Sequence, residues 1–245
     1  MRIVSWNIRA GGGRRVDAIA AQIERWRPDV LVLIEFRATP PSARLCALVA
    51  ELGLCHQAST ADPAQPAANR LLVASRQPLR PVRSRHAPSE PGRWLLVRLD
   101  APPPLVLGAM HVPNRVSGRK DAYHRGVLEF VRRWRGGPAL LAGDTNSGWI
   151  GLDEEVPCFG KREDAWMSGL EQAGWRDAFR LRNPDARAYT WHSPNAGNGF
   201  RLDEAFVNKG ALPLLVDTRY EWGSAGGARR DELSDHAALI IDLAL

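Results

Sequence analysis

The sequence predicts a layered domain of the α/β or α+β class, because strand-like and helix-like patterns alternate along its whole length. Short apolar runs of strand length recur between segments whose apolar residues repeat with helical spacing. No linker-like segment or internal repeat divides the 245 residues, a length that suits one large domain or two small ones. We therefore expect a single domain over residues 1–245.

In the first part of the chain, the N-terminal sequence RIVSWNI has the β-branched and aromatic content of a strand. A helix is expected next, because apolar residues from Val16 to Trp26 share one helical face before Pro28. Residues 29–34 form a continuous apolar run, which is typical of a strand covered on both faces. Residues 45–52 predict a second helix that ends at Gly53.

The rest of the chain continues this alternation. Strands are expected at residues 71–74, 94–99, 105–112, 139–142, 202–207 and 237–243. Helices are expected at residues 123–134, where arginines occupy the remaining surface, and at 166–173. Residues 62–68 and 222–231 have the composition of surface loops. These patterns leave the pairing of the strands open.

The composition, 44% hydrophobic and 24% charged, is that of a soluble globular protein. No apolar run approaches the roughly 20 residues of a membrane span, and the N-terminus lacks a signal-peptide pattern. Three cysteines at no metal-ligand spacing indicate reduced thiols, so we expect a cytoplasmic protein without a membrane partner. The formal net charge of +6 leans modestly towards a polyanionic partner.

Polar and acidic residues recur at the points where apolar strands stop or begin. Strand ends that open into loops are where α/β proteins carry catalytic groups, so this recurrence indicates a site. Taken singly, each residue has a plain alternative as a cap, a turn or a solvated strand end. Several oxygen ligands together would instead converge on a hard cation such as Mg²⁺. The residues are Asn7, Glu35, Asp144, Asn146, Asp235 and His236.

Five short blocks at these positions carry a resemblance to a known family. The blocks follow one another in the order seen in the endonuclease/exonuclease/phosphatase superfamily, which this sequence therefore resembles. They span essentially the whole chain. The resemblance implies a four-layered α-β-β-α sandwich with two packed mixed β-sheets, and Mg²⁺ as cofactor with Mn²⁺ as a possible substitute. The blocks are Ser5-Trp6-Asn7-Ile8, Glu35, Gly143-Asp144-Thr145-Asn146, Arg201-Leu202-Asp203 and Ser234-Asp235-His236.

A second set of blocks resembles the exonuclease III and apurinic/apyrimidinic endonuclease branch. It comprises DAFR at residues 177–180, Pro184, YTW at 189–191 and GFRLD at 199–203. In this branch Phe200 would form an aromatic wall for the site of a missing base, with a plain core aromatic as the equal alternative. The side chains expected to contact substrate are Arg37, Asn114, Trp149, Phe200 and Arg201; for Trp149, stacking on the substrate competes with a core position.

The chain departs from the branch pattern at several positions. The departing residues are Arg9 for a polar or acidic residue that can serve a second metal, Ile34 for Gln, Arg37 for Lys, His111 for Tyr, and Glu204 for Tyr or His. Phosphatase-like relatives often have His in the region of His111. His111 and Glu204 therefore favour an alternative substrate, a small-molecule or lipid-headgroup phosphate.

Phosphodiester hydrolysis needs an activated water, neutralised phosphate charge and a stabilised leaving oxygen. Glu35 is the expected Mg²⁺ ligand, with Asp235 near the metal or orienting its waters. Asp144 is the expected general base, since a carboxylate near Asn146 can take a proton from a held water. Asn7 and Asn146 are expected to donate amide hydrogens to phosphate oxygens without adding charge.

Two histidines complete the expected site. His236 is expected to pair with Asp203, because a carboxylate orients the imidazole and favours its protonated form. The alternative for His236 is a satisfied core histidine. His111 would be a further donor to the phosphate or the leaving oxygen.

The function we expect is a Mg²⁺-dependent phosphodiesterase acting on DNA in repair, as an abasic-site endonuclease or a 3′ exonuclease. A nucleic-acid-binding module with a lapsed site is a third reading. We expect a monomer with no obligate protein partner. Arg14-Arg15, residues 115–120, residues 132–135 and Arg229-Arg230 are basic clusters that more often form a solvated face, but could track a nucleic-acid backbone. Arg and Lys should then rim the cleft, with carboxylates on its floor.

Overall fold

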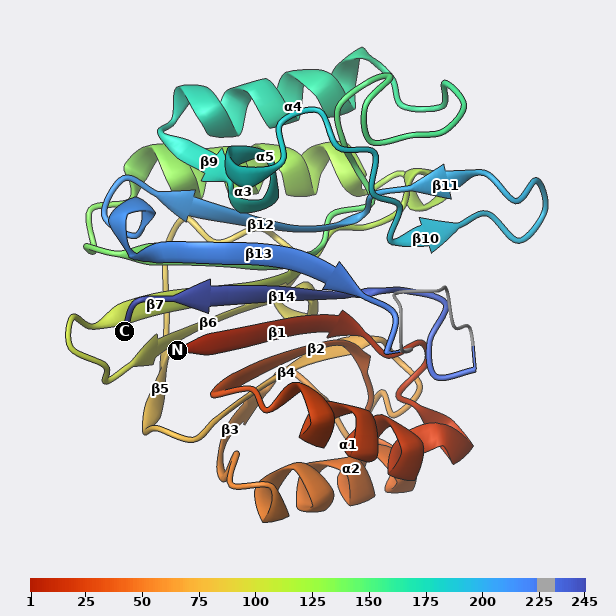
Figure 1. Ribbon diagram of the computed structural model, residues 1–245, viewed down its shortest axis with the longest axis vertical. Helices are drawn as coiled ribbons and strands as arrows, with labels where there is room; N and C mark the ends of the chain where they lie inside the picture. Colours follow the sequence, from red (N-terminus) through yellow and green to blue (C-terminus); the bar gives the residue numbers. More distant parts are fainter. Residues whose placement is uncertain (224–231) are drawn as a thin grey trace.

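The computed structural model, which describes residues 1–223 and 232–245, has four layers (Figure 1). Helices α1 (Val16–Trp26) and α2 (Pro40–Glu51) cover the outer face of one six-stranded sheet. Helices α3 (Lys120–Arg133) and α4 (Lys161–Gln172) cover the outer face of a second sheet. The predicted four-layered α-β-β-α sandwich with two mixed sheets is therefore confirmed.

The first sheet has the strand order β13-β14-β1-β2-β4-β3. Its two central strands, β1 and β2, are parallel, and all its other neighbours pair antiparallel. The strands are β1 (Arg2–Asn7), β2 (Val30–Phe36), β3 (His56–Ser59), β4 (Arg70–Ser75), β13 (Leu215–Glu221) and β14 (Ala238–Leu243).

The second sheet repeats this plan, with the order β5-β6-β7-β8-β12-β9 and one parallel pair, β7 and β8. Its strands are β5 (Leu79–Val82), β6 (Trp94–Leu99), β7 (Leu105–His111), β8 (Ala139–Asp144), β9 (Trp175–Asp177) and β12 (Asp203–Asn208). A short helix α5 (Ala178–Arg182) follows β9, and a two-stranded sheet of β10 (Trp191–His192) and β11 (Gly199–Phe200) projects at one end (Figure 1).

The core consists of one apolar layer between the sheets and one beneath each helix pair. Strand β2 shows why its sequence is apolar throughout. Val30, Val32 and Ile34 face the other sheet, whereas Leu31 and Leu33 face α1 and α2. Successive side chains of a strand point to opposite faces, so a strand covered on both sides has no solvent-facing position.

The elements with strong apolar patterns lie where the sequence predicts them. The second helix starts at Pro40, earlier than the predicted residue 45, because proline suits the first turn of a helix, where its missing N–H costs nothing. The sequence does not predict the edge strands β3, β5, β9 and β13, since an edge strand needs no apolar alternation.

The loop expected at residues 62–68 consists of turns and bends. Of the loop expected at 222–231, residues 224–231, with Arg229-Arg230, lie outside the described residues. No helix in the described ranges is both long and apolar enough to cross a membrane.

Candidate active site

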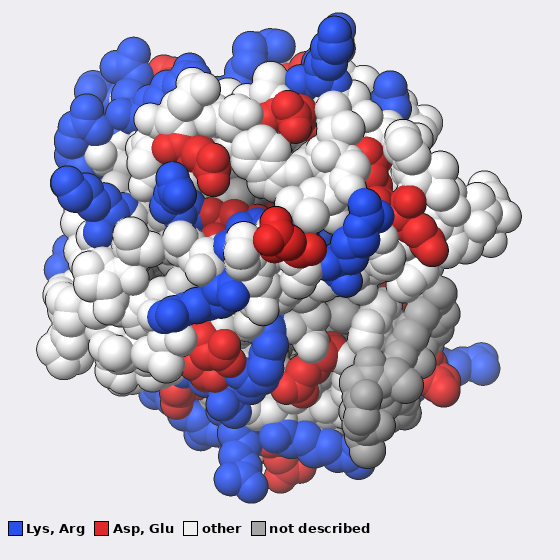
Figure 2. Space-filling model, turned by 45° about the horizontal axis from the view of Figure 1, so that its top comes forward, with Lys and Arg blue, Asp and Glu red and all other residues white. Residues whose placement is uncertain are grey.

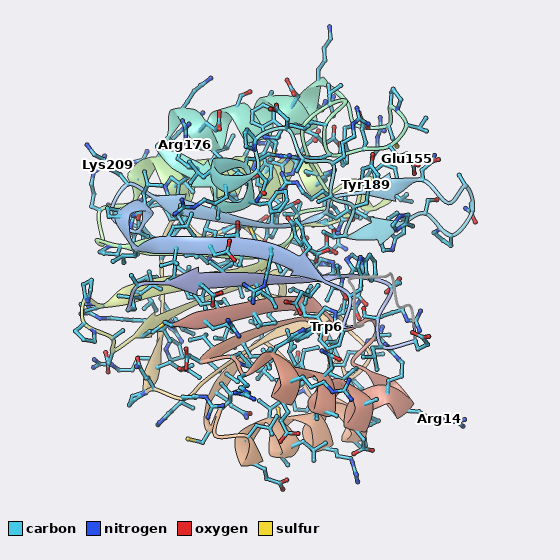
Figure 3. All side chains as sticks on the ribbon, viewed as in Figure 1. Trp6, Arg14, Glu155, Arg176, Tyr189 and Lys209 are labelled. Carbon is cyan, nitrogen blue, oxygen red and sulfur yellow. The ribbon has the colours of Figure 1, made fainter. Side chains whose placement is uncertain are left out.

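The predicted site residues come from strand ends and strand starts that meet at one end of the sandwich. Strand β8 ends at Asp144, and β12, which runs antiparallel to it, starts at Asp203 directly opposite. His111, the last residue of β7, is in register with Asp144 on the other side. Figure 3 shows Trp6, Tyr189 and Glu155 nearer this end, and Arg176 and Lys209 at the far end. The antiparallel pairing thus places residues that begin strands beside residues that end them.

A cavity of about 300 Å³ opens at this end of the two sheets. Seven predicted site residues line it: Glu35, His111, Asn114, Asp144, Asn146, Asp235 and His236. Asn7 and Asp203 lie directly behind this lining, each hydrogen-bonded to one of the seven. The cavity therefore collects the predicted base, the predicted histidines and the predicted metal carboxylates.

The Asp144 carboxylate is held in a fixed orientation. Its Oδ2 accepts a hydrogen bond from Asn7 Nδ2 at 3.1 Å, and its Oδ1 accepts one from the Asn146 backbone N–H at 3.0 Å. The Asn146 side chain donates to the Val112 carbonyl at 2.9 Å. In this structure both amides therefore position protein groups, whereas the sequence predicted that they donate to phosphate oxygens.

Burial raises the pKa of Asp144 to about 7; the nearby His236 opposes this rise and the Asp203 carboxylate adds to it. A carboxylate with a pKa near neutrality is suited to general-base catalysis at physiological pH. Asp144 is thus both oriented and electrostatically adjusted for taking a proton.

The residue before Asp144 is a glycine because there is no room for a side chain at this position. A Cβ atom built on Gly143 would lie 1.8 Å from the backbone carbonyl oxygen of Met110, on the adjacent strand β7. The close approach of β7 and β8 at this point aligns Asp144 with His111. The Gly-Asp pair is therefore required by backbone packing as well as by chemistry.

His236 and Asp203 form the predicted pair. His236 Nδ1 lies 2.8 Å from Asp203 Oδ2, and Trp6 Nε1 donates to the His236 carbonyl at 3.0 Å. Burial lowers the pKa of His236, but the surrounding carboxylates, chiefly Asp203 with Asp144 and Asp235, outweigh this effect and raise the pKa to about 9. His236 is therefore an imidazolium at neutral pH and can donate from Nε2.

His111 differs from His236 in charge. Its Nε2 lies 3.7 Å from Asp144 Oδ2, which is too long for a hydrogen bond. Burial, with Arg93 and His236 nearby, lowers the pKa of His111 well below its ordinary value. His111 is thus neutral and carries a single N–H, so it can donate to a substrate oxygen without adding charge.

Glu35 lies in a bulge of β2 that turns its side chain towards the cavity. The pairing with β4 shifts by one residue between Ile34 and Phe36, and Glu35 has a left-handed φ of 61°. Its Oε2 accepts a hydrogen bond from Ala10 N–H at 2.7 Å. A strained backbone of this kind persists where the surroundings fix it, often at a functional site.

The carboxylates in the cavity suit a Mg²⁺ ion that is held by few protein ligands. Glu35 and Asp235 both line the cavity, and the buried Oδ1 of Asp235 has no hydrogen-bond partner among the described residues. No group of three His, Cys, Asp or Glu side chains in the described ranges is placed to hold a metal. Mg²⁺ commonly uses one or two carboxylates plus water and substrate phosphate, so two carboxylates are sufficient.

The prediction that Arg201 contacts substrate is wrong. Its guanidinium is 0% exposed and binds Asp153, Asp177 and Glu204, with distances of 2.6 to 2.9 Å. Burial also raises the pKa of Glu204 well above its usual value. Both residues belong to a buried ion network, so Glu204 does not present its charge to the substrate.

The structure places Phe200, Trp149 and Arg37 outside the catalytic cavity. Phe200 packs behind Trp191, with ring centroids 6.0 Å apart, so Trp191 is the aromatic residue that lines the cavity. Trp149 lines a different cavity, beside α5. Arg37 donates to Asn69 Oδ1 at 2.7 Å and thereby positions a residue that does line the catalytic cavity.

Five lining residues were absent from the expected site: Arg9, Asn69, Arg93, Trp191 and Leu202. Arg93 immediately precedes β6, whose antiparallel pairing with β7 sets Trp94 opposite Met110, near His111. A polar residue before a strand is therefore as informative as one after it, once the pairing is known. Arg9 and Arg93 add positive charge to a cavity that also holds Glu35, Asp144 and Asp235. On the face shown in Figure 2, Lys and Arg form several separate groups with acidic side chains between them.

Comparison with known proteins agrees with this architecture. The sequence profile described as the Endonuclease/Exonuclease/phosphatase family matches residues 4–236. No curated protein sequence matches the chain.

Three solved structures match over 100% of this chain and 100% of their own, each with a TM-score of 0.81. They are a variant of the 3′ phosphatase NExo from Neisseria bound to a product DNA hairpin (20% identity), the 3′-5′ exonuclease NExo from Neisseria meningitidis (21%), and an AP endonuclease from Archaeoglobus fulgidus (17%). At these identities the likeness establishes a shared fold.

Proposed function

The chain belongs to the Endonuclease/Exonuclease/phosphatase family of phosphoester hydrolases, and from that premise we propose that it is a Mg²⁺-dependent phosphodiesterase acting on DNA. The reaction would be that of an abasic-site endonuclease or a 3′ exonuclease in DNA repair. The observation that carries the proposal is the pairing of an oriented base, Asp144, with an imidazolium donor, His236, in one cavity.

Each group has a role that its environment supports. Ionised Asp144 accepts the proton of the attacking water, because Asn7 and the Asn146 backbone fix its two oxygens. The His236 imidazolium, held by Asp203, donates to a phosphate oxygen as negative charge develops there. Neutral His111 supplies one further N–H to the phosphate or the leaving oxygen.

Glu35 and Asp235 are the residues that would hold the cation. Bound Mg²⁺ would neutralise phosphate charge as a Lewis acid. Arg9 and Arg93, which line the same cavity, contribute further positive charge towards the phosphate. The cavity can therefore accept an anion although three carboxylates line it.

A second candidate function is hydrolysis of a small-molecule or lipid-headgroup phosphate. The observation that favours it is His111, a neutral donor beside Asp144 at the floor of a cavity of only about 300 Å³. A terminal phosphate with part of a small molecule would fit in such a cavity without a nucleic-acid strand along the surface.

One panel of substrates distinguishes the two functions. Abasic-site duplex DNA, DNA with a recessed 3′ end, p-nitrophenyl phosphate and bis-p-nitrophenyl phosphate would each be offered with Mg²⁺, with Mn²⁺ and with EDTA. Cleavage of DNA that stops in EDTA is the expected result. Turnover of the small substrates alone would favour the second candidate instead.

Two variants test the assigned residues in the same panel. Asp144→Asn and His236→Ala should abolish cleavage, while Asp62→Asn, in the surface loop at residues 62–68, should leave it unchanged. Full activity of Asp144→Asn would contradict the mechanism. DNA binding without turnover in the wild-type protein would point to a binding module.

We also propose that the protein works in the cytoplasm as a monomeric single catalytic domain. The three cysteines, which are all free, support a reducing compartment. Fractionation of the source cells and light scattering of the purified protein would test the two statements.

A further inference from the structure

A second cavity lies between the first turns of α3 and α4. Its volume is about 600 Å³, compared with about 300 Å³ for the catalytic cavity, and this is within the range of ligand-binding sites. Four of its lining side chains are basic and two are acidic: Arg115, Lys120, Lys161, Arg162, Asp121 and Glu163.

Ion pairing within this cavity leaves an excess of positive charge. Glu163 is neutralised by Lys120 at 2.8 Å, and Asp121 is neutralised by Arg162. Arg115 donates only to the neutral carbonyl of Cys158, at 3.3 Å. The Lys161 ammonium makes no hydrogen bond or ion pair with any residue that the structure describes. Two cations are thus available to an anionic ligand.

One hydrogen bond and one chain-adjacent pair of residues link the lining of the second cavity to that of the catalytic one. The buried Lys120 donates to the Asn146 carbonyl at 2.5 Å as well as to Glu163, which leaves one of the three ammonium protons for a ligand. Asn114, which lines the catalytic cavity, directly precedes Arg115, which lines the second. A ligand that extends out of the catalytic cavity along residues 114–120 would therefore reach the second cavity.

We propose that this cavity binds a backbone phosphate of the nucleic-acid strand whose scissile phosphodiester occupies the catalytic cavity. The inference rests on the proposed function, because it identifies where the substrate strand is held outside the reacting centre. A phosphodiester carries one negative charge and several acceptor oxygens, matching the free donors of Arg115 and Lys161.

The double variant Arg115→Ala/Lys161→Ala tests this inference. Both side chains are exposed, so their removal should leave the fold intact. DNA binding would be measured in EDTA, which prevents cleavage, at about 50 to 200 mM salt. We expect weaker binding, with the slope of log affinity against log salt reduced by roughly one, as for the loss of one phosphate contact. Turnover of bis-p-nitrophenyl phosphate, which has no strand, should be unchanged.

The matched control is Arg132→Ala/Arg133→Ala, which removes the same charge from exposed positions at the other end of α3. It should retain most of the wild-type affinity and salt slope. Equal losses in the two double variants would overturn the inference, since net charge alone would then explain the effect.

The remaining outcomes separate this inference from the proposed function. Normal DNA cleavage by the wild type, with unaltered DNA binding by the Arg115→Ala/Lys161→Ala variant, contradicts the inference alone. Absence of DNA cleavage by the wild type contradicts both. The same cavity could instead bind free phosphate, which calorimetric titration with inorganic phosphate would detect. If the Arg115→Ala/Lys161→Ala variant lost phosphate binding but kept its DNA binding, the cavity would be assigned to a free anion and the inference would be overturned.

Discussion

Asp144 and Asp203 lie directly opposite each other on the antiparallel strands β8 and β12, and only Asp203 is hydrogen-bonded to His236. The same backbone register therefore supplies two carboxylates in different environments. Asp203 supports a positive charge, and its own charge helps to raise the pKa of the buried Asp144. Asp144, with a pKa of about 7, and His236, with a pKa of about 9, can then act as base and acid in one reaction.

Replacing Asp203 by Asn should lower the pKa of His236 below its ordinary value. Burial lowers this pKa, and the substitution removes the carboxylate that raises it most. His236 would lose its proton near neutrality, and we expect turnover to fall about 10²- to 10⁴-fold. NMR titration of the imidazole and the pH profile of kcat would both report the change. Asp217→Asn, on edge strand β13, is the control. An unaltered His236 titration would contradict the assigned pairing.

Folding stability should depend on pH through the same pair. The pKa of His236 is about 9 in the folded protein and near 6.5 when unfolded, so the folded state binds the proton more tightly. The stabilisation is complete below about pH 6.5 and is lost as the pH rises through about 9, with a span of about 3 kcal/mol. Urea denaturation of the wild type and of His236→Asn, without metal, should give free energies of unfolding whose difference shrinks over this window. A difference that stays constant with pH would refute the linkage.

Arg201→Met should destabilise the fold by about 3 to 5 kcal/mol, because it leaves Asp153, Asp177 and Glu204 buried without their shared cation. The exposed ion pair between Arg44 and Asp17 provides the control, since Arg44→Met should cost less than about 1 kcal/mol. Urea denaturation at neutral pH measures both. A similar small cost for the two variants would show that the buried network contributes little.

The sequence predicts the parts of this site that terminate strongly apolar strands. Asp144 and Glu35 follow or interrupt buried parallel strands whose patterns are plain. Arg93 and Trp191 could not be found in this way, because Arg93 precedes a strand of unknown pairing and Trp191 lies in a two-residue strand. The sequence predicts the wrong role for Arg201 for a different reason. Its partners Asp153 and Asp177 are distant in sequence, and composition does not distinguish a buried arginine from a substrate-binding one.

Glu35→Gln should weaken binding of a divalent cation about tenfold or more, because a neutral amide replaces one of the two carboxylates available to it. The measurement is calorimetric titration with Mn²⁺ in the absence of substrate, which reports the cation site independently of turnover. Glu51→Gln, at the exposed end of α2, controls for the lost charge. The bulge of β2 should survive the substitution, since a Gln side-chain oxygen can still accept from Ala10 N–H. Wild-type Mn²⁺ affinity in Glu35→Gln would place the cation elsewhere.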